Sequence, residues 1–600
     1  MFLYDGKVLL GTASADPASG AFAFATLPAM AAGTHRLTAQ AQDAAGNLGI
    51  ASAAQILSVA GDGTVTITQV RADKSKDVYL TNVTGKSYVA EHDTIDSRGV
   101  TTDIVRTHAD KSLDYTYHLD TTTGMKTVDT YDAAGRLKTD LVTRADGSTD
   151  LKTYAGDGRT LVSEVIKFAQ GPGQTELSDT FQYSNGILVS ETQVHADKSR
   201  DVYLTNVTGK SYVAEHDTFN GRGVNTDIVR SHADGSLDYS YHLDTTTGVK
   251  TADTYDAAGR LKTDLVTRAD GSTDLKTYAG DGRTLVSEAI KFAQGPGQTE
   301  LSDTFQYSNG ILVSETQVHA DKSKDVYLMN VTGKSYVAEH DTIDSRGVTT
   351  DIVRTHADKS LDYTYHLDTT TGVKTADTYD AAGRLKTDLV TRADGSTDLK
   401  TYAGDGRTLV SEAIKFAQGP GQTELSDTFQ YSNGTLVKET QVHADKSKDV
   451  FDFNVTGKNY VADHYFYTAD GKLATTDLTY ADGSHAQTAS QAGQTLVSHA
   501  NVTDTLKSFG GDTFVFGQGF GKDVVVGFRA GSSAGHDVLV LDTAQAASFQ
   551  DMQANHMITA SGRDTLITLS STDTILLKNM APSALIADDV QFQDHGLFHA

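Results

Sequence analysis

The sequence has 600 residues, with 51 Lys and Arg against 78 Asp and Glu and therefore a net charge of −27. This length exceeds what one hydrophobic core supports, so several domains are expected, and the acidity disfavours nucleic acid and anionic lipid as partners. Cysteine is absent, which excludes disulfides, thiolate metal sites and a cysteine nucleophile, whereas the many carboxylates suit hard cations such as calcium.

The composition favours short strands and tight turns. The chain has 54 glycines, 6 prolines and no tryptophan, and it is rich in Thr, Val, Tyr and Asp. These residues suit strands and turns, and no long segment has the 3.6-residue apolar period of a helix. No apolar run approaches the roughly 18 residues of a membrane span. We therefore predict an all-β fold without a membrane span.

Residues 1–60 have the pattern of short strands joined by turns. Asp5-Gly6 suits a hairpin turn, and the stretch from Asp43 to Asn47 marks a second turn. Strands at this spacing are typical of a β-sandwich. We expect a strand, a turn and a second strand over residues 3–8, and further strands over 21–24, 34–42 and 50–59.

Three stretches of this segment resemble bacterial Ig-like domains, which are strung along large surface adhesins. The resemblance implies a partial Ig-like domain over residues 1–60, because such domains are longer, and a chain that is the C-terminal piece of a longer protein. The alternative is a small β cap on the segment that follows. The matching stretches are Asp5-Gly6, Ala32-Gly33-Thr34-His35 and Asp43-Ala44-Ala45-Gly46-Asn47.

A block of 124 residues is repeated almost unchanged along the middle of the chain. The stretch Ala-Asp-Lys-Ser-(Lys/Arg)-Asp-Val recurs at this interval, with its second aspartate at Asp77, Asp201, Asp325 and Asp449. We predict a tandem β-repeat array over residues 61–490. Its blocks are 71–194, 195–318, 319–442 and a partial copy, 443–490.

The turn residues predict how many strands a block contains. Between Lys74 and Lys198 they define ten intervals, so the 124 residues divide into 12.4 per interval. A strand of roughly seven or eight residues plus a turn of four or five fills that length. Leu113, Tyr115 and Tyr117 alternate with polar residues, as a half-buried strand requires. Each block is therefore predicted to be an up-down meander of ten strands, stabilised by its neighbours.

One motif of the block resembles the Tyr-Asp repeats of bacterial cell-surface and toxin shell proteins. The motif is Tyr-Asp-Ala-Ala-Gly-Arg-Leu, at 131–137, 255–261 and 379–385. The resemblance implies a sheet built from hairpins. A toxin shell would also need an encapsulated effector domain, for which the sequence offers no candidate.

The His, Asp, Glu and Tyr residues of the array could bind ligands or have purely structural roles. Any cluster of His, Asp and Glu recurs in each block, and an enzyme seldom needs three identical tandem sites, whereas a binding surface gains avidity from copies. We therefore predict that the chain is not an enzyme. Asp73, Ser75 and Asp77 have the spacing of an EF-hand's first ligands, but the later Gly and Glu are missing, so turn roles are favoured. The tyrosines could stack on sugars or pack against neighbours.

The last hundred residues repeat an aspartate followed by a short apolar strand. This pattern is typical of a β-roll, in which each coil can direct a carboxylate and backbone carbonyls towards calcium. We predict a β-roll-like module over residues 491–600. Strands are expected at 512–516, 536–542, 563–569 and 573–577, and a turn followed by a strand is expected over 518–528.

Gly510 to Phe516, Gly519 to Asp523 and Leu585 to Phe592 resemble the C-terminal module of RTX proteins. The resemblance implies calcium binding and an uncleaved type I secretion signal, which would explain why Met1 to Gly6 lacks the features of a signal peptide. The full RTX nonapeptide is absent, so few calcium sites are expected. The predicted metal ligands are Asp512, Asp523 and Asp537, and the alternative is that they cap turns.

These patterns predict a secreted, calcium-associated protein located outside the cell or on the bacterial surface. It would act as an adhesin or spacer through multivalent weak binding. Its expected partners are the type I secretion apparatus and a polysaccharide or cell surface. The alternative is the C-terminal fragment of an exported RTX enzyme, with its catalytic domain upstream; these residues contain no His-Glu-x-x-His zinc motif.

Overall fold

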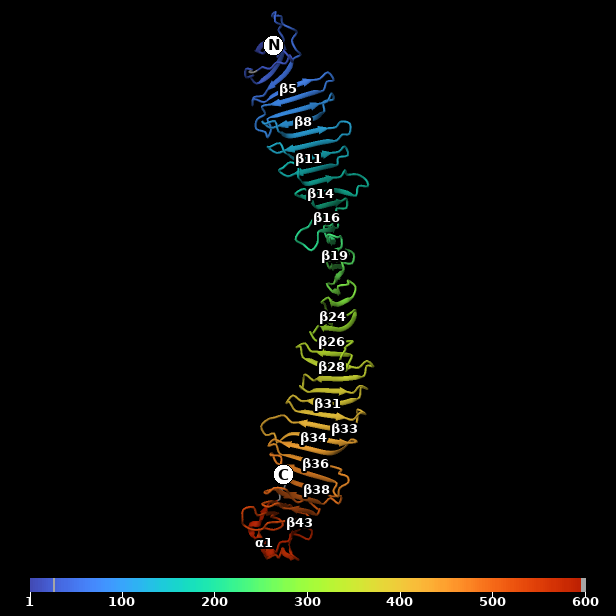
Figure 1. The fold of residues 1–600 in the computed structure, drawn as a ribbon, viewed down its shortest axis with the longest axis vertical. Coiled ribbons are helices and arrows are strands. Elements are labelled where there is room, and N and C mark those ends of the chain that lie inside the picture. Colours follow the sequence, from blue (N-terminus) through green and yellow to red (C-terminus); the bar gives the residue numbers. More distant parts are fainter. Residues whose placement is uncertain (25–26, 595–600) are drawn as a thin grey trace. The chain divides into compact units, whose positions relative to one another are not determined.

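The computed structural model describes residues 1–24 and 27–594, and within them the all-β prediction is confirmed. The chain forms 48 strands, one α-helix and two 3-10 helices in the described residues (Figure 1). It divides into two compact units, Met1–Gln294 and Gly295–Ala600, which are described separately. The six residues that end the predicted 491–600 module lie outside the described residues.

The first unit contains one antiparallel sheet. From β3 onward each strand pairs with the next along the chain, and β1 pairs with both β2 and β3. Its strands are β1 (Phe2–Asp5), β2 (Val8–Thr12), β3 (Gly33–Gln40), β4 (Gln55–Val59), β5 (Val65–Val70), β6 (Lys76–Thr81), β7 (Ala90–Ile95), β8 (Thr101–Thr107), β9 (Leu113–Leu119), β10 (Lys126–Tyr131), β11 (Leu137–Thr143), β12 (Thr149–Tyr154), β13 (Leu161–Lys167), β14 (Glu176–Ser184), β15 (Ile187–His195), β16 (Arg200–Leu204), β17 (Ala214–Phe219), β18 (Asn225–Ser231), β19 (Leu237–Leu243), β20 (Lys250–Tyr255), β21 (Leu261–Thr267), β22 (Thr273–Tyr278) and β23 (Leu285–Lys291).

The sandwich predicted for residues 1–60 does not form among the described residues. Strands β1 to β4 lie in one sheet, and β4 pairs directly with β5, so this sheet continues into the array. The physical reason is a shortage of apolar side chains for a second layer to cover. Of the described residues in this segment, Leu57 alone is a buried apolar side chain, while Val8 and Ile56 are 64% and 54% exposed. The strand expected over 21–24 is also absent.

The ten strands predicted for a block are present in the first copy as β6 to β15. Most of the predicted turn residues have the left-handed backbone that a tight turn requires, for example Lys111 at φ 68° and Gly147 at φ 87°. In the turn predicted at Pro172, the left-handed residue is Gly173, at φ 87°. The prediction of ten strands per block, made from the turn residues, is therefore confirmed for the first copy.

A carboxylate closes the turn that carries Lys111. Asp110 Oδ1 accepts hydrogen bonds from the Ser112 backbone N–H at 2.9 Å and from its hydroxyl at 2.6 Å. Such a side-chain bond to the backbone two residues on stabilises the turn, so a left-handed lysine is tolerated. The second block has Gly235 at this position, with φ 83°.

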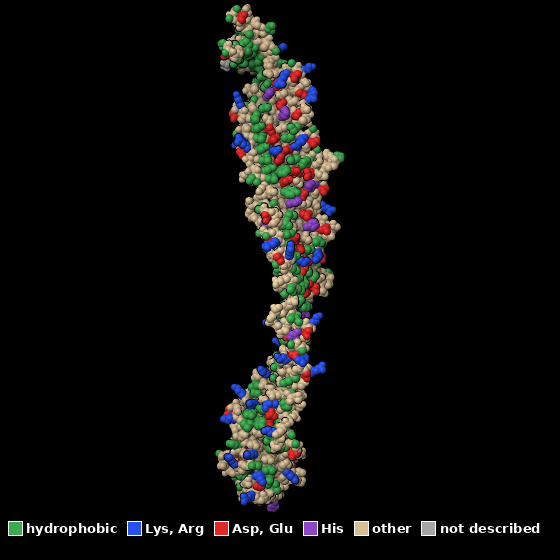
Figure 2. Space-filling model, turned by 45° about the vertical axis from the view of Figure 1, so that its right-hand side comes forward, with side chains coloured by type: hydrophobic (Ala, Val, Ile, Leu, Met, Phe, Trp, Pro, Cys, Tyr) green, Lys and Arg blue, Asp and Glu red, His purple; other side chains and the backbone are tan. Residues whose placement is uncertain are grey.

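The array in the first unit is a single-layer sheet. Among the described residues of this unit, Leu57 is the one apolar side chain that is buried. The cross-strand register instead places half-buried Ile104, Tyr117, Val128 and Leu141 in a row on one face. Such pairs contribute about 0.2–1 kcal/mol each, so many neighbouring strands are needed for stability. Apolar, acidic and histidine side chains consequently lie uncovered on the visible face (Figure 2).

The second unit begins with the same kind of antiparallel meander, from β24 to β39. Its strands are β24 (Glu300–Ser308), β25 (Ile311–His319), β26 (Lys324–Leu328), β27 (Ala338–Ile343), β28 (Thr349–Thr355), β29 (Leu361–Leu367), β30 (Lys374–Tyr379), β31 (Leu385–Thr391), β32 (Thr397–Tyr402), β33 (Leu409–Lys415), β34 (Glu424–Ser432), β35 (Thr435–His443), β36 (Lys448–Asp452), β37 (Ala462–Tyr467), β38 (Leu473–Thr479) and β39 (His485–Ala489).

The chain then coils between two sheets, as a β-roll does. Strands β39, β41, β43 and β47 are parallel in the first sheet, and β40, β42, β44 and β48 are parallel in the second. The remaining elements are β40 (Thr495–Val497), β41 (Asp504–Lys507), β42 (Thr513–Phe516), β43 (Lys522–Val526), β44 (Val538–Asp542), α1 (Phe549–Ala554), β45 (Ile558–Ser561), β46 (Asp564–Thr568), β47 (Thr574–Lys578), η1 (Pro582–Ala584), η2 (Ala587–Asp589) and β48 (Val590–Gln593).

This roll contains the main apolar core of the second unit. Alternate residues of its short strands point inward, and Leu506, Phe514, Phe516 and Leu539 are fully buried there. The alternation of buried and half-buried residues follows from the two-residue period of a strand. No helix in the described part of the chain is both long and apolar enough to cross a membrane.

Candidate functional site

The three aspartates predicted to bind metal are buried at the turns of the roll, in two separate places. Asp512, Asp523 and Asp537 are 0%, 1% and 0% exposed. Asp512 and Asp537 are adjacent, because the Asp512 backbone N–H donates to Asp537 Oδ1 at 2.8 Å. The Ser508 hydroxyl also lies between them, at 2.9 Å from Asp512 and 2.8 Å from Asp537.

The carboxylates of Asp512 and Asp537 are surrounded by N–H donors. Asp512 accepts from the backbone of Gln494 at 2.8 Å, Phe509 at 2.7 Å and Gly510 at 2.9 Å, and Asp537 accepts from Arg529 at 2.7 Å. Calcium requires several converging oxygens, whereas N–H groups present partial positive charge. These contacts do not fit calcium and match the turn-capping alternative. Calcium binding by the three aspartates stays a prediction from sequence.

Asp523 belongs to a different group of buried carboxylates. Its Oδ1 accepts from the Asp504 backbone N–H at 2.8 Å, and its Oδ2 contacts the Ser498 hydroxyl. Burial raises the pKa of Asp523 to about 7. Asp589, which the sequence-based prediction missed, has the same kind of role as Asp512, because its oxygens accept from Gly531 and Ile586 at 2.7 and 2.9 Å.

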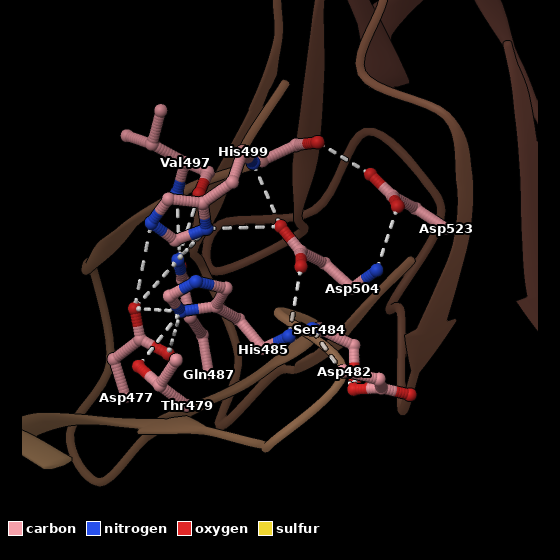
Figure 3. A network of polar contacts seen from close by, with 11 residues as sticks. Asp477, Thr479, Asp482, Ser484, His485, Gln487, Val497, His499, Asp504 and Asp523 are labelled. Atoms are coloured by element: carbon pink, nitrogen blue, oxygen red, sulfur yellow. Dashed lines mark hydrogen bonds and ion pairs between the residues drawn. The ribbon is translucent and has the colours of Figure 1, made fainter. Parts of the chain in front are cut away.

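A cluster of Asp477, His485 and His499 lies where the array meets the roll, and it too was missed from sequence. Asp477 is on β38, His485 begins β39, and His499 follows β40. One donor atom of each residue lies within 4.8 Å of the other two. Figure 3 shows the two imidazoles face to face, with Asp477 on one side and Asp504 on the other.

The distances within this cluster are short. His485 Nδ1 lies 3.1 and 3.2 Å from the two oxygens of Asp477, and His499 Nε2 lies 3.7 Å from Asp477 Oδ2. The two rings stack with centroids 3.7 Å apart and planes 17° from parallel. The side chains of Asp477 and His485 are 17% and 18% exposed, and that of His499 is 40% exposed.

Asp504 orients both histidines from behind. It is fully buried and accepts from the backbone N–H groups of His485 at 3.0 Å and His499 at 2.7 Å. Its Oδ2 also lies 3.0 Å from His499 Nδ1, and this hydrogen bond raises the pKa of His499. Gln487 ties β40 to β39 through bonds to both backbone groups of Val497, at 3.0 and 2.7 Å. Beside the cluster is a hollow of about 210 Å³.

Aligning the blocks shows that two residues of this cluster differ from the repeat. In the third block His340 pairs with Val353 and Thr355 pairs with Leu361, whereas 124 residues later His464 pairs with Asp477 and Thr479 with His485. Asp477 and His485 therefore replace a valine and a leucine of the repeat. The substitutions occur in the partial copy alone, because the first two blocks also carry valine and leucine at these positions, namely Val105, Leu113, Val229 and Leu237.

A second arrangement recurs in the array. Asp325 lies between His319 and His340, at 2.6 and 2.8 Å, and the Tyr327 ring stacks on His340 with centroids 4.2 Å apart. A hollow of about 270 Å³ adjoins Tyr327 and His340. The equivalent stacks are Tyr79–His92, Tyr203–His216 and Phe451–His464, each at 4.2 Å.

The EF-hand alternative for the start of the block is not supported by these contacts. Asp73 Oδ1 accepts from the backbone and hydroxyl of Ser75, at 3.0 and 2.6 Å, which is a turn contact. Asp77 is directed instead towards Arg71 and His92, at 2.7 and 3.1 Å. The turn interpretation therefore holds for this stretch.

Asp427, a buried carboxylate of the array, provides a pH prediction. It is 9% exposed, its Oδ1 has no hydrogen-bond partner in the described residues, and burial beside Glu424 and Glu439 raises its pKa to about 6. Between about pH 4 and this value the native state binds more protons than the unfolded state, so stability falls as pH rises and then levels. Asp427→Asn is expected to stabilise the second unit at pH 7.5 by no more than about 1 kcal/mol after solvent screening.

The control for that prediction is Asp405, whose pKa is shifted in the opposite direction. Hydrogen bonds from Thr408 and Arg407 lower the pKa of Asp405 to about 2. The ionised Asp405 carboxylate therefore stabilises the folded state above the unfolded pKa near 4, and this stabilisation is lost as pH falls towards 2. Asp405→Asn should therefore lower the Tm at pH 7.5, whereas Asp427→Asn raises it. Thermal melts from pH 3 to 8 provide the test. A change in Tm of the same sign for both variants at pH 7.5 would contradict the opposite pKa shifts of Asp427 and Asp405.

Gly531-Ser532-Ser533-Ala534-Gly535 has the Gly-x-Ser-x-Gly spacing of a serine-hydrolase elbow, a motif that the sequence-based prediction overlooked. It lies in the loop between β43 and β44, not on a strand-to-helix turn. The ring nitrogens of His536 lie near backbone carbonyls, 2.9 Å from Ser533 and 3.3 Å from Asp588. The histidine is thus not arranged as a base for the Ser533 hydroxyl.

No family model and no curated protein matches this sequence. The crystal structure of TcdB2-TccC3 without its hypervariable C-terminal region aligns with 74% of this chain and 29% of that chain, at 12% identity and a TM-score of 0.12. The crystal structure of TcdB2-TccC3 aligns with 75% of this chain and 31% of that one, at 13% identity and a TM-score of 0.10. This chain spans under a third of their length. TM-scores this low support no inference about fold or function. The RTX and Ig-like resemblances remain predictions from sequence.

Proposed function

We propose that the array is a multivalent binding surface of an exported protein and that it also acts as a spacer. One observation carries the proposal: the blocks are nearly identical, and in each unit the array's strands pair in series with mostly half-exposed side chains. Identical side chains are therefore presented again and again. Copies of a weak site raise avidity without any new contact, which favours binding over catalysis as the role of the array.

The ligand class that best suits this surface is a neutral polysaccharide. Each stack of an aromatic ring on a histidine lies beside carboxylates, such as Glu315 and Glu339 around the hollow at Tyr327. Apolar ring faces and hydrogen-bond acceptors together suit sugar rings and their hydroxyl groups. The net charge of −27 disfavours anionic polymers.

Export through a type I apparatus, to the exterior or to the bacterial surface, is part of this proposal. The two-sheet roll at residues 491–594 supports it as the kind of module that the RTX resemblance implies. The alternative is that these residues are the C-terminal part of an exported enzyme with its catalytic domain upstream. Removing residues 491–600 should stop export; product still reaching the medium through the same exporter would refute this part.

Deletion of whole blocks tests the binding proposal. Removing residues 195–318, or 195–442, joins equivalent positions of the repeat, so strand order and turns are preserved. On an array of immobilised neutral glycans, the apparent affinity is expected to fall by about 100-fold or more from three blocks to one. Soluble monovalent sugar should show the same weak affinity for both. Equal binding by the full and shortened chains would exclude multivalency, and no binding by either would leave a spacer role alone.

A further inference from the structure

We propose that Asp477, His485 and His499 bind one divalent transition-metal ion of the Zn²⁺ class, which fastens the last strands of the array to the first coil of the roll. The three residues come from three consecutive segments, β38, β39 and the loop after β40. They offer two imidazole nitrogens and one carboxylate, within 4.8 Å of one another. A single ion would thus join two strands of the antiparallel meander to the chain that begins the second sheet.

The donor set selects the class of ion. Imidazole nitrogens suit Zn²⁺, Co²⁺, Ni²⁺ and Cu²⁺, whereas Ca²⁺ and Mg²⁺ take oxygen ligands. Three protein ligands with a further position open to water is a familiar arrangement for zinc. This site therefore differs in chemistry from the predicted calcium ligands. Asp512 and Asp537 belong to another turn of the roll, whereas Asp523 adjoins the cluster through its bond to Asp504.

The surroundings are organised as metal sites require. The contact between Asp504 and His499 Nδ1, at 3.0 Å, leaves Nε2 directed towards Asp477. A buried carboxylate behind a ligating histidine fixes the ring and increases its basicity. Among the described residues no Lys or Arg forms an ion pair with Asp477 or Asp504, so no fixed side-chain cation competes for the site.

Binding requires one local movement. A metal ion lies in the plane of each imidazole that ligates it, about 2.0–2.1 Å from the nitrogen, so two stacked rings cannot share an ion without turning. Asp504 holds the His499 ring through Nδ1, and the adjoining hollow of about 210 Å³ is lined by Asp477 and His499. We therefore expect the His485 ring to rotate and the stack to open when the ion binds.

The repeat itself provides independent support. At the positions of Asp477 and His485 the three full blocks carry valine and leucine, which cannot ligate. Both changes to ligand-type residues occur in the copy that adjoins the roll, where His499 supplies the third donor. Two half-buried apolar side chains have thus been exchanged for polar ones at the place where a third ligand is available.

The same comparison supplies variants that are compatible with the fold. Asp477→Val and His485→Leu restore the residues that the blocks carry on equivalent strands, so the double variant should fold. His366→Gln is the matched control, because His366 is an exposed histidine 2.6 Å from Asp351 that belongs to no cluster of three donors in the described part of the chain.

The experiment is a calorimetric Zn²⁺ titration of the tag-free full chain after treatment with a chelator. One site per chain is expected, and the double variant should bind at least about 100-fold more weakly while H366Q is unchanged. At about 100 times the Kd, Zn²⁺ should raise the Tm of the wild-type chain by about 5 °C, and Ca²⁺ should not reproduce this. Co²⁺ should give visible d–d bands that the double variant lacks.

Two results would overturn the proposal. The first is a wild-type chain that binds no Zn²⁺ and gives no Co²⁺ bands. The second is a folded double variant, judged by circular dichroism, that binds Zn²⁺ with the stoichiometry and affinity of the wild type. In the second case the ion would be held by other histidines of the array.

Discussion

Replacing Phe516 by alanine is expected to destabilise the C-terminal roll by about 3–5 kcal/mol, the usual cost of deleting a fully buried aromatic side chain. Phe516 is 0% exposed on β42, and its ring packs against Phe520 with centroids 4.9 Å apart. The roll is thin, with strands of only three to five residues, so the cavity would extend between its two sheets. Because the surrounding core relaxes only partially around such a cavity, much of the lost packing is not recovered.

The matched control is Phe509→Ala in the same module. Phe509 is 53% exposed, so removing its ring leaves no internal cavity, and the change should stay within about 0.5 kcal/mol. Urea unfolding of both variants, followed by near-UV circular dichroism, gives the two free energies. A Phe516→Ala variant as stable as Phe509→Ala would mean that the roll does not depend on this core. A cost confined to the roll, with the array signal unchanged, is expected.

The array and the roll were predictable from sequence because local patterns decide both. Turn residues at positions such as Lys74 and Gly147 fix where strands end, and these positions recur in every block. In the roll, an aspartate before each alternating strand marked a turn, and the strands formed as expected around Phe514. The sandwich at residues 1–60 was wrong because short strands suggest a second layer without showing whether apolar surface exists to hold one.

The candidate metal cluster could not be predicted from any single segment. Asp477 and His485 stand out once strand register aligns them with Val353 and Leu361, and that register depends on the pairing of β38 with β37 and β39. His499 lies in a loop whose position is set by Asp504 and by the packing of the roll. The role of Asp512 was predicted only in part. Its position at a turn followed from sequence, but the N–H groups that bond to its carboxylate come from two separate stretches of backbone, at Gln494 and at Phe509 and Gly510.

Asp512→Ala is expected to cost about 3–5 kcal/mol, because it removes the acceptor of several buried donors at once. The backbone N–H groups of Gln494, Phe509 and Gly510, together with the Ser508 hydroxyl, all bond to this carboxylate. Asp512→Asn should recover part of the loss, since one amide oxygen still accepts while the NH₂ group faces donors.

Asp482 is the control for this prediction, because it is an exposed turn aspartate of the same unit whose bonds within the described residues go to Ser484 alone. Asp482→Ala should therefore cost far less. Hydrogen exchange adds a local measure: the amides of Phe509 and Gly510 should lose protection in Asp512→Ala while amides in the array keep theirs. If stability instead fell equally for the alanine and asparagine variants, and only when calcium was present, the carboxylate would be a metal ligand and its turn-capping role would be secondary. We expect instead that calcium leaves the stability of each protein unchanged, both for the wild type and for each variant. The reason is that the surrounding N–H donors already compensate the buried charge that calcium would otherwise compensate.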